Sequence, residues 1–201
     1  MENNLLIKII YNGKKYFLDT FESVLKQTYL FWEWIIVDDC SNDETFDFVK
    51  DKISGDKRIV LLKTKNNCGA AAARNIGIEN ASGRFIAFLD ADDLWKPNKL
   101  ETQVKYMLEN ECAFSYSNYD LLKTNGSIVE LESKFNEIDY KTLLKTNDIG
   151  CLTVMYDTEK IGKVYMPIDA PKKKEYTIPQ EIKIEIVRGN ACHDSTILRD
   201  V

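Results

Sequence analysis

Four short apolar runs alternate with segments of helical spacing over the first ninety residues of the chain. The runs are 5–10, 34–37, 59–62 and 85–89, and the apolar residues between them recur at the intervals of amphipathic helices. Strands and helices in alternation predict a parallel sheet with helices on both faces, because each parallel connection needs a crossover. The sequence therefore predicts an α/β fold.

Polar residues follow three of these predicted strands. Tyr11-Asn12 follows the first strand, Asp38-Asp39 the second and Asp90-Ala91-Asp92 the fourth. In an open parallel sheet, ligands bind beyond the carboxyl ends of the strands. These three segments are therefore predicted to form one site.

The most acidic of these segments carries Asp90, Asp92 and Asp93 directly after the apolar run 85–89. Residues two apart in an extended backbone project to the same side, so Asp90 and Asp92 are expected to face one ligand. A Mn²⁺ or Mg²⁺ ion that carries a diphosphate suits two carboxylates, because it keeps positions for phosphate and water oxygens. The alternative is a turn whose aspartates cap the following helix, and Asp93 is assigned to that role.

Local signals predict further elements along the chain. Ser41-Asn42-Asp43-Glu44 has the spacing of a capping box, which predicts the start of a helix. Asn125-Gly126 predicts a hairpin turn before residues 128–129. The remaining predictions are strands at 113–119, 151–156 and 182–186, the last an exposed edge open to pairing, and a short helix at 140–146.

Composition argues against several classes of protein. The 201 residues carry a formal net charge of −5, whereas nucleic-acid binders usually present a basic face. The five cysteines are far apart and form no CxxC pair, so free thiols in a reducing cytoplasm are expected. The single histidine, His193, excludes multi-histidine metal chemistry. No apolar run reaches membrane-spanning length, and the N-terminus does not have the pattern of a signal peptide.

Five segments in order resemble the nucleotide-sugar-binding half of the family 2 inverting glycosyltransferases, and the resemblance covers about residues 7–170. The segments are 11–13, 22–29, 37–43, 67–77 and 88–93. The resemblance implies the GT-A fold, an α/β architecture in which helices flank a Rossmann-like, mostly parallel sheet beside a smaller mixed acceptor-side region. It also implies a donor-binding subdomain over 1–110 and an acceptor-side region over 111–201, which diverges from the family after about residue 175.

The same resemblance implies a role for each matching residue. Tyr11 would lie against the nucleotide base, and a carboxylate of Asp38-Asp39 would accept hydrogen bonds from uracil or ribose. Arg74 would stand near the base and the diphosphate, because its planar fork suits phosphate; a surface ion pair is the alternative. Asp90 would touch ribose or the metal ion. Asp92 would bind the Mn²⁺ or Mg²⁺ that bridges the diphosphate.

In this family the catalytic base is a carboxylate further along the chain, often the second member of a Glu-Asp pair. Glu175 falls at that place and is the candidate base, with Lys174 where the Glu would be; a solvated loop carboxylate is the alternative. The sequence departs from the family at three points. The segment before Tyr11 is about two or three residues short, Pro179 breaks the helix expected after Glu175, and residues 176–201 match no pattern of the family.

These features favour a hexosyl- or N-acetylhexosaminyltransferase. It would move a sugar with inversion from a UDP-sugar to a glycan or lipid-linked acceptor in surface polysaccharide or lipopolysaccharide biosynthesis. The alternatives are a non-catalytic nucleotide-sugar-binding module or truncated relic, and a sugar-1-phosphate nucleotidyltransferase, for which the loop after the first strand is a poor match. The expected location is the cytoplasm or, through the basic run 172–174, the inner face of the cell membrane. The oligomeric state is left open.

Overall fold

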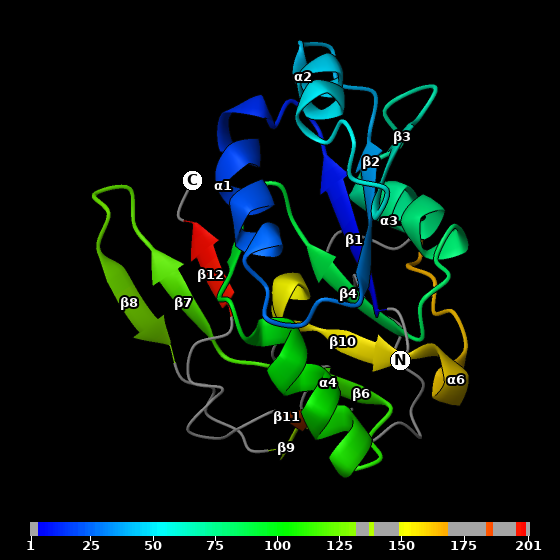
Figure 1. The fold of residues 1–201 in the computed structure, drawn as a ribbon, viewed down its shortest axis with the longest axis vertical. Coiled ribbons are helices and arrows are strands. Elements are labelled where there is room, and N and C mark those ends of the chain that lie inside the picture. Colours follow the sequence, from blue (N-terminus) through cyan, green and yellow to red (C-terminus); the bar gives the residue numbers. More distant parts are fainter. Residues whose placement is uncertain (1–3, 132–136, 139–148, 169–183, 187–195, 200–201) are drawn as a thin grey trace.

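A computed structural model describes residues 4–131, 137–138, 149–168, 184–186 and 196–199. An eight-stranded sheet crosses the molecule in the order β3-β2-β1-β4-β10-β6-β11-β9 (Figure 1). Its first half is parallel and consists of β1 (Asn4–Ile10), β2 (Trp32–Asp38), β3 (Ile59–Lys63) and β4 (Phe85–Leu89). All four strands coincide with the apolar runs, so the predicted α/β fold is confirmed.

The second half of the large sheet is mixed. β10 (Met155–Asp157) runs antiparallel to both β4 and β6 (Phe114–Tyr116), so β4 and β6 point the same way. β11 (Ile184–Ile186) pairs with β6 on one side and with β9 (Glu137–Ile138) on the other. The prediction of an exposed edge at 182–186 is therefore wrong, because β11 is hydrogen-bonded along both of its sides.

A smaller sheet lies beside the large one in the order β5-β12-β7-β8. Its strands are β5 (Leu94–Trp95), β7 (Tyr119–Leu122), β8 (Ile128–Leu131) and β12 (Thr196–Arg199). β7 and β8 form the hairpin predicted from Asn125-Gly126, and Gly126 has the positive φ of 81° that favours glycine in such a turn. The hairpin prediction is confirmed.

Helices cover both faces of the parallel half of the sheet. α1 (Lys14–Leu25), α2 (Thr45–Lys52) and α4 (Lys99–Glu109) pack on one face, and α3 (Ala70–Glu79) packs on the other. The residues of β2 alternate accordingly. Trp34 and Ile36 belong to the core under α1, α2 and α4, and Ile35 and Val37 belong to the core under α3. Because both faces are covered, the central strands are apolar at successive positions.

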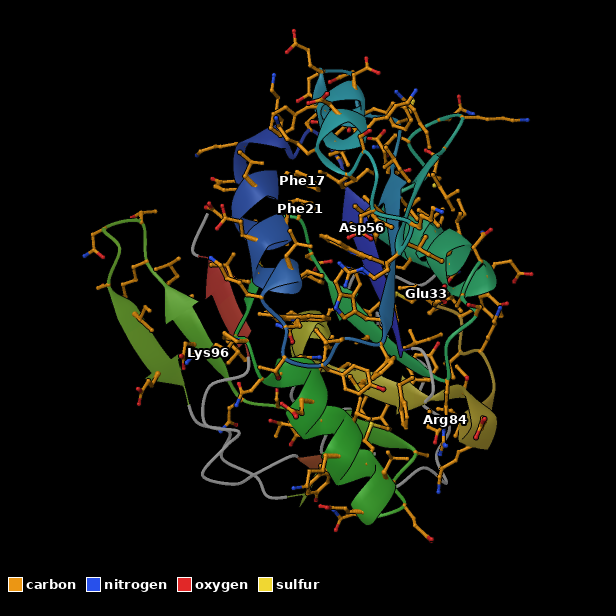
Figure 2. All side chains as sticks on the ribbon, viewed as in Figure 1. Phe17, Phe21, Glu33, Asp56, Arg84 and Lys96 are labelled. Atoms are coloured by element: carbon orange, nitrogen blue, oxygen red, sulfur yellow. The ribbon has the colours of Figure 1, made fainter. Side chains whose placement is uncertain are left out.

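The position of α1 is fixed by aromatic packing on β2. Phe17 and Phe21 of α1 stack on the indole of Trp34, with ring centroids 6.4 and 6.1 Å away (Figure 2). Such pairs contribute about 0.5–1.5 kcal/mol each beyond the area they bury. This packing also fixes the start of α1, and with it the loop that joins β1 to α1.

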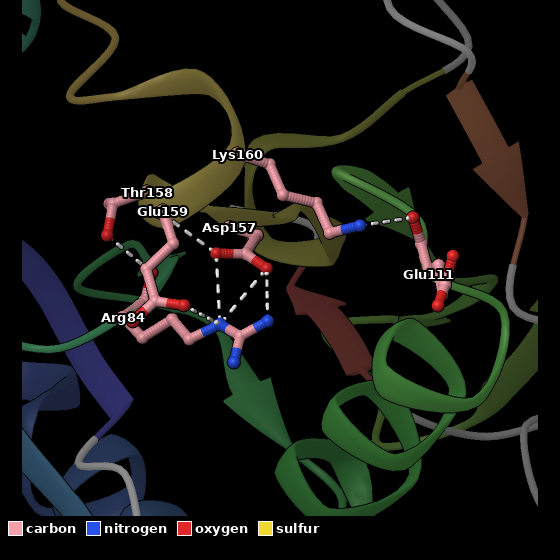
Figure 3. A network of polar contacts seen from close by, with 6 residues as sticks. All are labelled: Arg84, Glu111, Asp157, Thr158, Glu159 and Lys160. Atoms are coloured by element: carbon pink, nitrogen blue, oxygen red, sulfur yellow. Dashed lines mark hydrogen bonds and ion pairs between the residues drawn. The ribbon is translucent and has the colours of Figure 1, made fainter.

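An ion pair between the partly buried Arg84 and the buried Asp157 holds the beginning of β4 to α6 (Thr158–Ile161). The guanidinium of Arg84 donates to both carboxylate oxygens of Asp157, at 2.8 Å from Nη2 to Oδ2 and 3.1 Å from Nε to either oxygen (Figure 3). Asp157 also caps α6 by accepting the backbone N–H of Glu159 at 3.0 Å.

Among the described helices, none combines the length and apolar character needed to cross a lipid bilayer.

The capping box predicted at residues 41–44 does not form. α2 begins at Thr45, whose N–H donates to the carboxylate of Asp43 at 2.9 Å. Ser41 is engaged elsewhere, because its hydroxyl accepts the N–H of Asn12 and its own N–H donates to Asp38. Contacts to the loop after β1 and to the end of β2 thus determine the role of Ser41, and the local spacing does not.

Several other predicted elements differ from the structure. The strand predicted at 113–119 is divided into β6 and β7, and the one predicted at 151–156 opens with a 3-10 turn, η1 (Cys151–Thr153). Asp93, predicted to cap the next helix, does not directly precede α4: it is 3% exposed, β5 follows it, and α4 starts after Asn98. The helix predicted at 140–146 lies outside the described residues.

Candidate functional site

Three of the predicted segments meet at one edge of the sheet. β1 lies between β2 and β4, with Ile10 beside Asp38 and Lys8 beside Leu89. The chain segments that leave these parallel strands at Tyr11, Asp39 and Asp90 are therefore neighbours, as the sequence predicted. The edge brings together an exposed aromatic ring and several carboxylates.

Reciprocal hydrogen bonds join the loop after β1 to the loop after β2. The N–H of Asn12 donates to the hydroxyl of Ser41 at 3.0 Å, and the amide oxygen of Asn12 accepts the N–H of Asn42 at 3.1 Å. Asn12 has φ of 48°, a conformation that asparagine tolerates better than most residues. Tyr11, 46% exposed, precedes this junction, so its backbone is fixed while its ring remains open to a ligand.

The turn that follows β4 packs against the same loop. A Cβ atom at Gly13 would lie 2.7 Å from Cγ1 of Ile10 and 3.2 Å from Cβ of Ala91, so this close approach requires glycine. The hydroxyl of Thr20 on α1 donates to the backbone oxygen of Ala91 at 3.0 Å. Asp90 and Asp92, on either side of Ala91, are thereby held next to the loop that carries Tyr11.

Asp38 and Asp39 have different environments although they are adjacent. The carboxylate of Asp38 is fully buried, and its Oδ1 accepts the N–H of Ser41 at 2.9 Å. No hydrogen-bond donor among the described residues reaches its Oδ2. Asp38 thus shapes the turn at 38–41, in which Cys40 has a positive φ of 61°.

The carboxylate of Asp39 holds the start of α3. Its Oδ2 accepts the N–H of Gly69 at 2.8 Å, and its Oδ1 accepts the N–H and the thiol of Cys68 and the hydroxyl of Thr64. Burial by itself would raise the pKa of Asp39, but these hydrogen bonds outweigh it and lower the pKa below its ordinary value. Burial and the adjacent carboxylate raise the pKa of the Cys68 thiol to about 11, so this thiol is protonated at neutral pH.

Arg74 of α3 is directed to the same edge. Its Nη2 lies 2.7 Å from Oδ1 of Asp90, and the whole residue is only 8% exposed. The predicted alternative of a surface ion pair does not describe this contact, because the guanidinium is buried. The site therefore contains one buried cation in contact with the carboxylate cluster.

Asp92 differs from Asp90 in having no partner among the described residues. It is partly exposed, and within the described part of the chain it makes no hydrogen bond or ion pair. The described residues contain no cluster of three or more His, Cys, Asp or Glu side chains that could hold a metal ion by themselves. Mg²⁺ and Mn²⁺ in phosphate sites commonly use one or two carboxylates and complete their shells with phosphate and water oxygens. Asp92, with Asp90 beside it, fits such a donor set.

The sequence did not identify all the residues that shape the site. Thr64 and Gly69 bind Asp39, and Met166 contacts Arg74, although these partners are 25, 30 and 92 positions apart. Nothing in the local pattern of Thr64 or Met166 marks such contacts; Gly69 at least stands inside the segment 67–77. The candidate base Glu175 lies outside the described residues.

A comparison with protein families now adds to this geometry. The sequence model of glycosyl transferase family 2 matches residues 6–164, which span all the site residues described above except Met166. The chain belongs to glycosyl transferase family 2.

Relatives of this family 2 chain carry descriptive names. It is 45% identical over 161 residues to TuaG of Bacillus subtilis (strain 168), named as a teichuronic acid biosynthesis glycosyltransferase; the match covers 78% of this chain and 63% of TuaG. It is 44% identical over 168 residues to WfgD of Escherichia coli, named as a UDP-Glc:alpha-D-GlcNAc-diphosphoundecaprenol beta-1,3-glucosyltransferase. That match covers 82% of this chain and 65% of WfgD. The family 2 chain thus spans somewhat less than two thirds of the length of these relatives.

The fold of the family 2 chain is also found in a solved structure. The crystal structure of S. aureus TarS 1-349 in complex with UDP matches with a TM-score of 0.75 and 19% sequence identity. The match covers 98% of this chain and 60% of that chain. At this identity the likeness supports the fold alone.

Proposed function

We propose that this chain binds a UDP-sugar and transfers its sugar, with inversion, to a glycan or lipid-linked acceptor in surface polysaccharide biosynthesis. Membership of family 2 and the printed names of TuaG and WfgD support this proposal. The observation that carries it is the sheet edge at which the exposed ring of Tyr11, the buried Arg74 and the carboxylate of Asp92 meet. Among the described residues, Asp92 has no partner.

In this proposal each part of the edge meets one part of the donor. Tyr11 lies against the uracil ring, and a carboxylate of the Asp38-Asp39 pair accepts from the imide N–H of uracil or a ribose hydroxyl. Asp39 keeps capacity for this, because its Oδ2 has a single donor among the described residues and a carboxylate oxygen can accept two. Arg74 and the carboxylates at 90 and 92 then lie where the diphosphate would follow.

The reaction requires charge stabilisation on the leaving diphosphate. A divalent cation held by Asp92 and Asp90 would supply it as a Lewis acid. Arg74 adds a positive charge near the diphosphate. The orientation of its guanidinium is set before the donor binds, because the ion pair with Asp90 is already formed. A carboxylate, for which Glu175 is the proposed residue, takes the proton from the acceptor hydroxyl as that oxygen attacks the anomeric carbon in line. The bond to the diphosphate breaks at the same time, which inverts the anomeric centre.

We also propose a division of labour along the chain, with donor binding in residues 1–110 and acceptor contacts in 111–201. β6 supports this division, because its carboxyl end lies at the same sheet edge as that of β4, two strands away. An acceptor approaching from β6 would meet the donor at Asp90 and Asp92. The proposed location is the cytoplasm or the inner face of the cell membrane.

The experiment is a calorimetric titration with UDP, with and without Mn²⁺, on the wild-type protein and Asp92→Ala. Metal-dependent binding that Asp92→Ala abolishes would support the proposal. The matched control is Asp51→Ala, which removes an exposed carboxylate at the far end of α2. Absence of binding to folded wild-type protein would overturn the proposal.

A turnover assay separates the enzyme from a binding module. With UDP-glucose as donor, Glu175→Gln is expected to lower kcat by about a hundredfold or more, because general-base catalysis contributes that much. Its effect on UDP affinity should be small. UDP binding without any transfer or hydrolysis would instead identify a nucleotide-sugar-binding module.

A further inference from the structure

The side-chain amide of Asn75 forms hydrogen bonds with both backbone groups of Met166. Its Nδ2 donates to the backbone oxygen of Met166 at 2.8 Å, and its Oδ1 accepts the N–H of Met166 at 2.7 Å. One amide thus reproduces the paired hydrogen bonds of an antiparallel ladder between residues 91 positions apart. The contact leaves Met166 little freedom to move along or away from α3.

Met166 in turn contacts the guanidinium of Arg74. Its Sδ lies 3.9 Å from Nη1 of Arg74, and the residue is 7% exposed within the core on the α3 face. The other terminal nitrogen, Nη2, lies 2.7 Å from Asp90. The guanidinium therefore lies between a thioether on one side and a carboxylate on the other, and Met166 limits the directions that it can take.

A second contact holds the same segment to α3 without Asn75. The ammonium of Lys163 donates to the backbone oxygen of Glu79 at 2.8 Å, and the hydroxyl of Tyr165 donates to the carboxylate of Glu79. In Figure 1 the segment after α6 accordingly returns alongside α3. Loss of the Asn75 amide would release Met166 locally while this second contact still holds the segment.

We propose that Asn75 is a positioning residue for the donor diphosphate. It fixes Met166, Met166 fixes one side of the Arg74 guanidinium, and the guanidinium then presents its charge to the phosphates next to Asp90. Asn75 touches no ligand in this arrangement, and its effect passes through Arg74. The inference rests on the proposed function, because it concerns phosphate recognition at the same site.

The test compares UDP with uridine, which has the same base and ribose but no phosphate. If Asn75 acts through Arg74, Asn75→Ala should weaken UDP binding by about three- to tenfold and leave uridine binding unchanged. Arg74→Gln should weaken UDP binding by about tenfold or more, as expected for a charged hydrogen bond. The double variant should bind UDP no more weakly than Arg74→Gln, because residues that act as one unit are not additive. A change in folding alone would lower both affinities together.

Two further variants keep the result interpretable. Asn80→Ala is the matched control, since Asn80 directly follows α3 and its amide donates to the backbone oxygen of Ile76 in that helix. Asn75→Asp retains the acceptor for the N–H of Met166 but loses the donor, and it should weaken UDP binding in the same direction if Asn75→Ala fails to fold.

Three results would overturn the inference. They are unchanged UDP affinity in folded Asn75→Ala, an equal loss of UDP and uridine binding, and fully additive losses in the double variant. Absence of UDP binding by folded wild-type protein would overturn the proposed function and the inference together, whereas the other results concern Asn75 alone.

Discussion

Arg74 and Asp90 form an ion pair of 2.7 Å between a helix that covers the sheet and the end of a central strand. The side chain of Arg74 is 9% exposed and that of Asp90 is 34% exposed. Asp92, two positions further on, has no such partner within the described residues. Two carboxylates that look equivalent in the sequence therefore have different roles before any ligand binds. Asp90 orients the guanidinium of Arg74, and Asp92 remains available to bind a metal ion.

This difference predicts unequal stability effects for two isosteric substitutions. Asp90→Asn should lower the free energy of unfolding by about 1–2 kcal/mol, because it leaves the buried guanidinium without its anion, discounted for the partial exposure of Asp90. Asp92→Asn should change it by less than about 0.5 kcal/mol. Urea denaturation at neutral pH measures both. Equal losses would show that Asp92 has a structural partner in solution.

A second prediction concerns the acid dependence of stability. The pKa of Asp39 in the folded protein is below its ordinary value of 3.8, so the folded state binds this proton less readily than the unfolded state. The ionised carboxylate of Asp39 therefore contributes to the free energy of unfolding. This contribution is fully present above about pH 4 and is lost as the pH falls through the lowered pKa of the folded state. Asp39→Asn should remove that part of the pH dependence.

The same variant should also be less stable at pH 7. An amide at this position would direct its NH₂ group at a backbone N–H of Cys68 or Gly69, at a cost of about 1–3 kcal/mol. Urea midpoints measured between pH 2 and pH 7 test both statements, with Asp51→Asn as the control at an exposed carboxylate. A curve for Asp39→Asn that runs parallel to the wild type would contradict the assignment.

The parallel half of the fold was predictable because its signal is local. Residues 85–89 are buried at every position, and an apolar run of five reports this directly. The order of the polar segments after these strands likewise follows from topology, which is why Tyr11, Asp39 and Asp90 were placed at one edge correctly.

The remainder depends on contacts between distant residues. Ser41 has the spacing of a helix cap but accepts the N–H of Asn12 in the loop after β1, and Asn75 looks like any polar helix residue until Met166 is placed beside it. Likewise, the alternation at 113–119 reports burial but not that β6 and β7 belong to different sheets. Periodicity indicates which face of a helix or strand is buried. It does not indicate which segment packs on that face.

A third prediction concerns the ion pair of Arg84 and Asp157. The side chain of Asp157 is 1% exposed and that of Arg84 is 19% exposed, so little solvent screens the pair. A double-mutant cycle with Arg84→Met and Asp157→Asn should give a coupling energy of about 1–3 kcal/mol. The pair of Arg58 and Asp56 is the control, because its Nη2 to Oδ2 distance of 2.7 Å is similar but its side chains are more exposed, at 42% and 25%. Figure 2 labels Arg84 of the first pair and Asp56 of the second. The coupling of the control pair should stay below about 1 kcal/mol, and similar values for the two pairs would refute the role given to burial.

The last prediction separates the backbone and the side chain of Asn12. Its φ of 48° is unfavourable for alanine, by about 1–2 kcal/mol, but not for glycine, and its amide oxygen accepts the N–H of Asn42. Asn12→Ala should therefore lower the free energy of unfolding by more than Asn12→Gly does. Both variants lose the hydrogen bond that fixes the backbone next to Tyr11, so both should weaken UDP binding by a similar factor, measured by calorimetry. If Asn12→Gly binds UDP as the wild type does, the amide of Asn12 is not what holds Tyr11 in position, and the hydroxyl of Ser41 alone is sufficient to join the two loops.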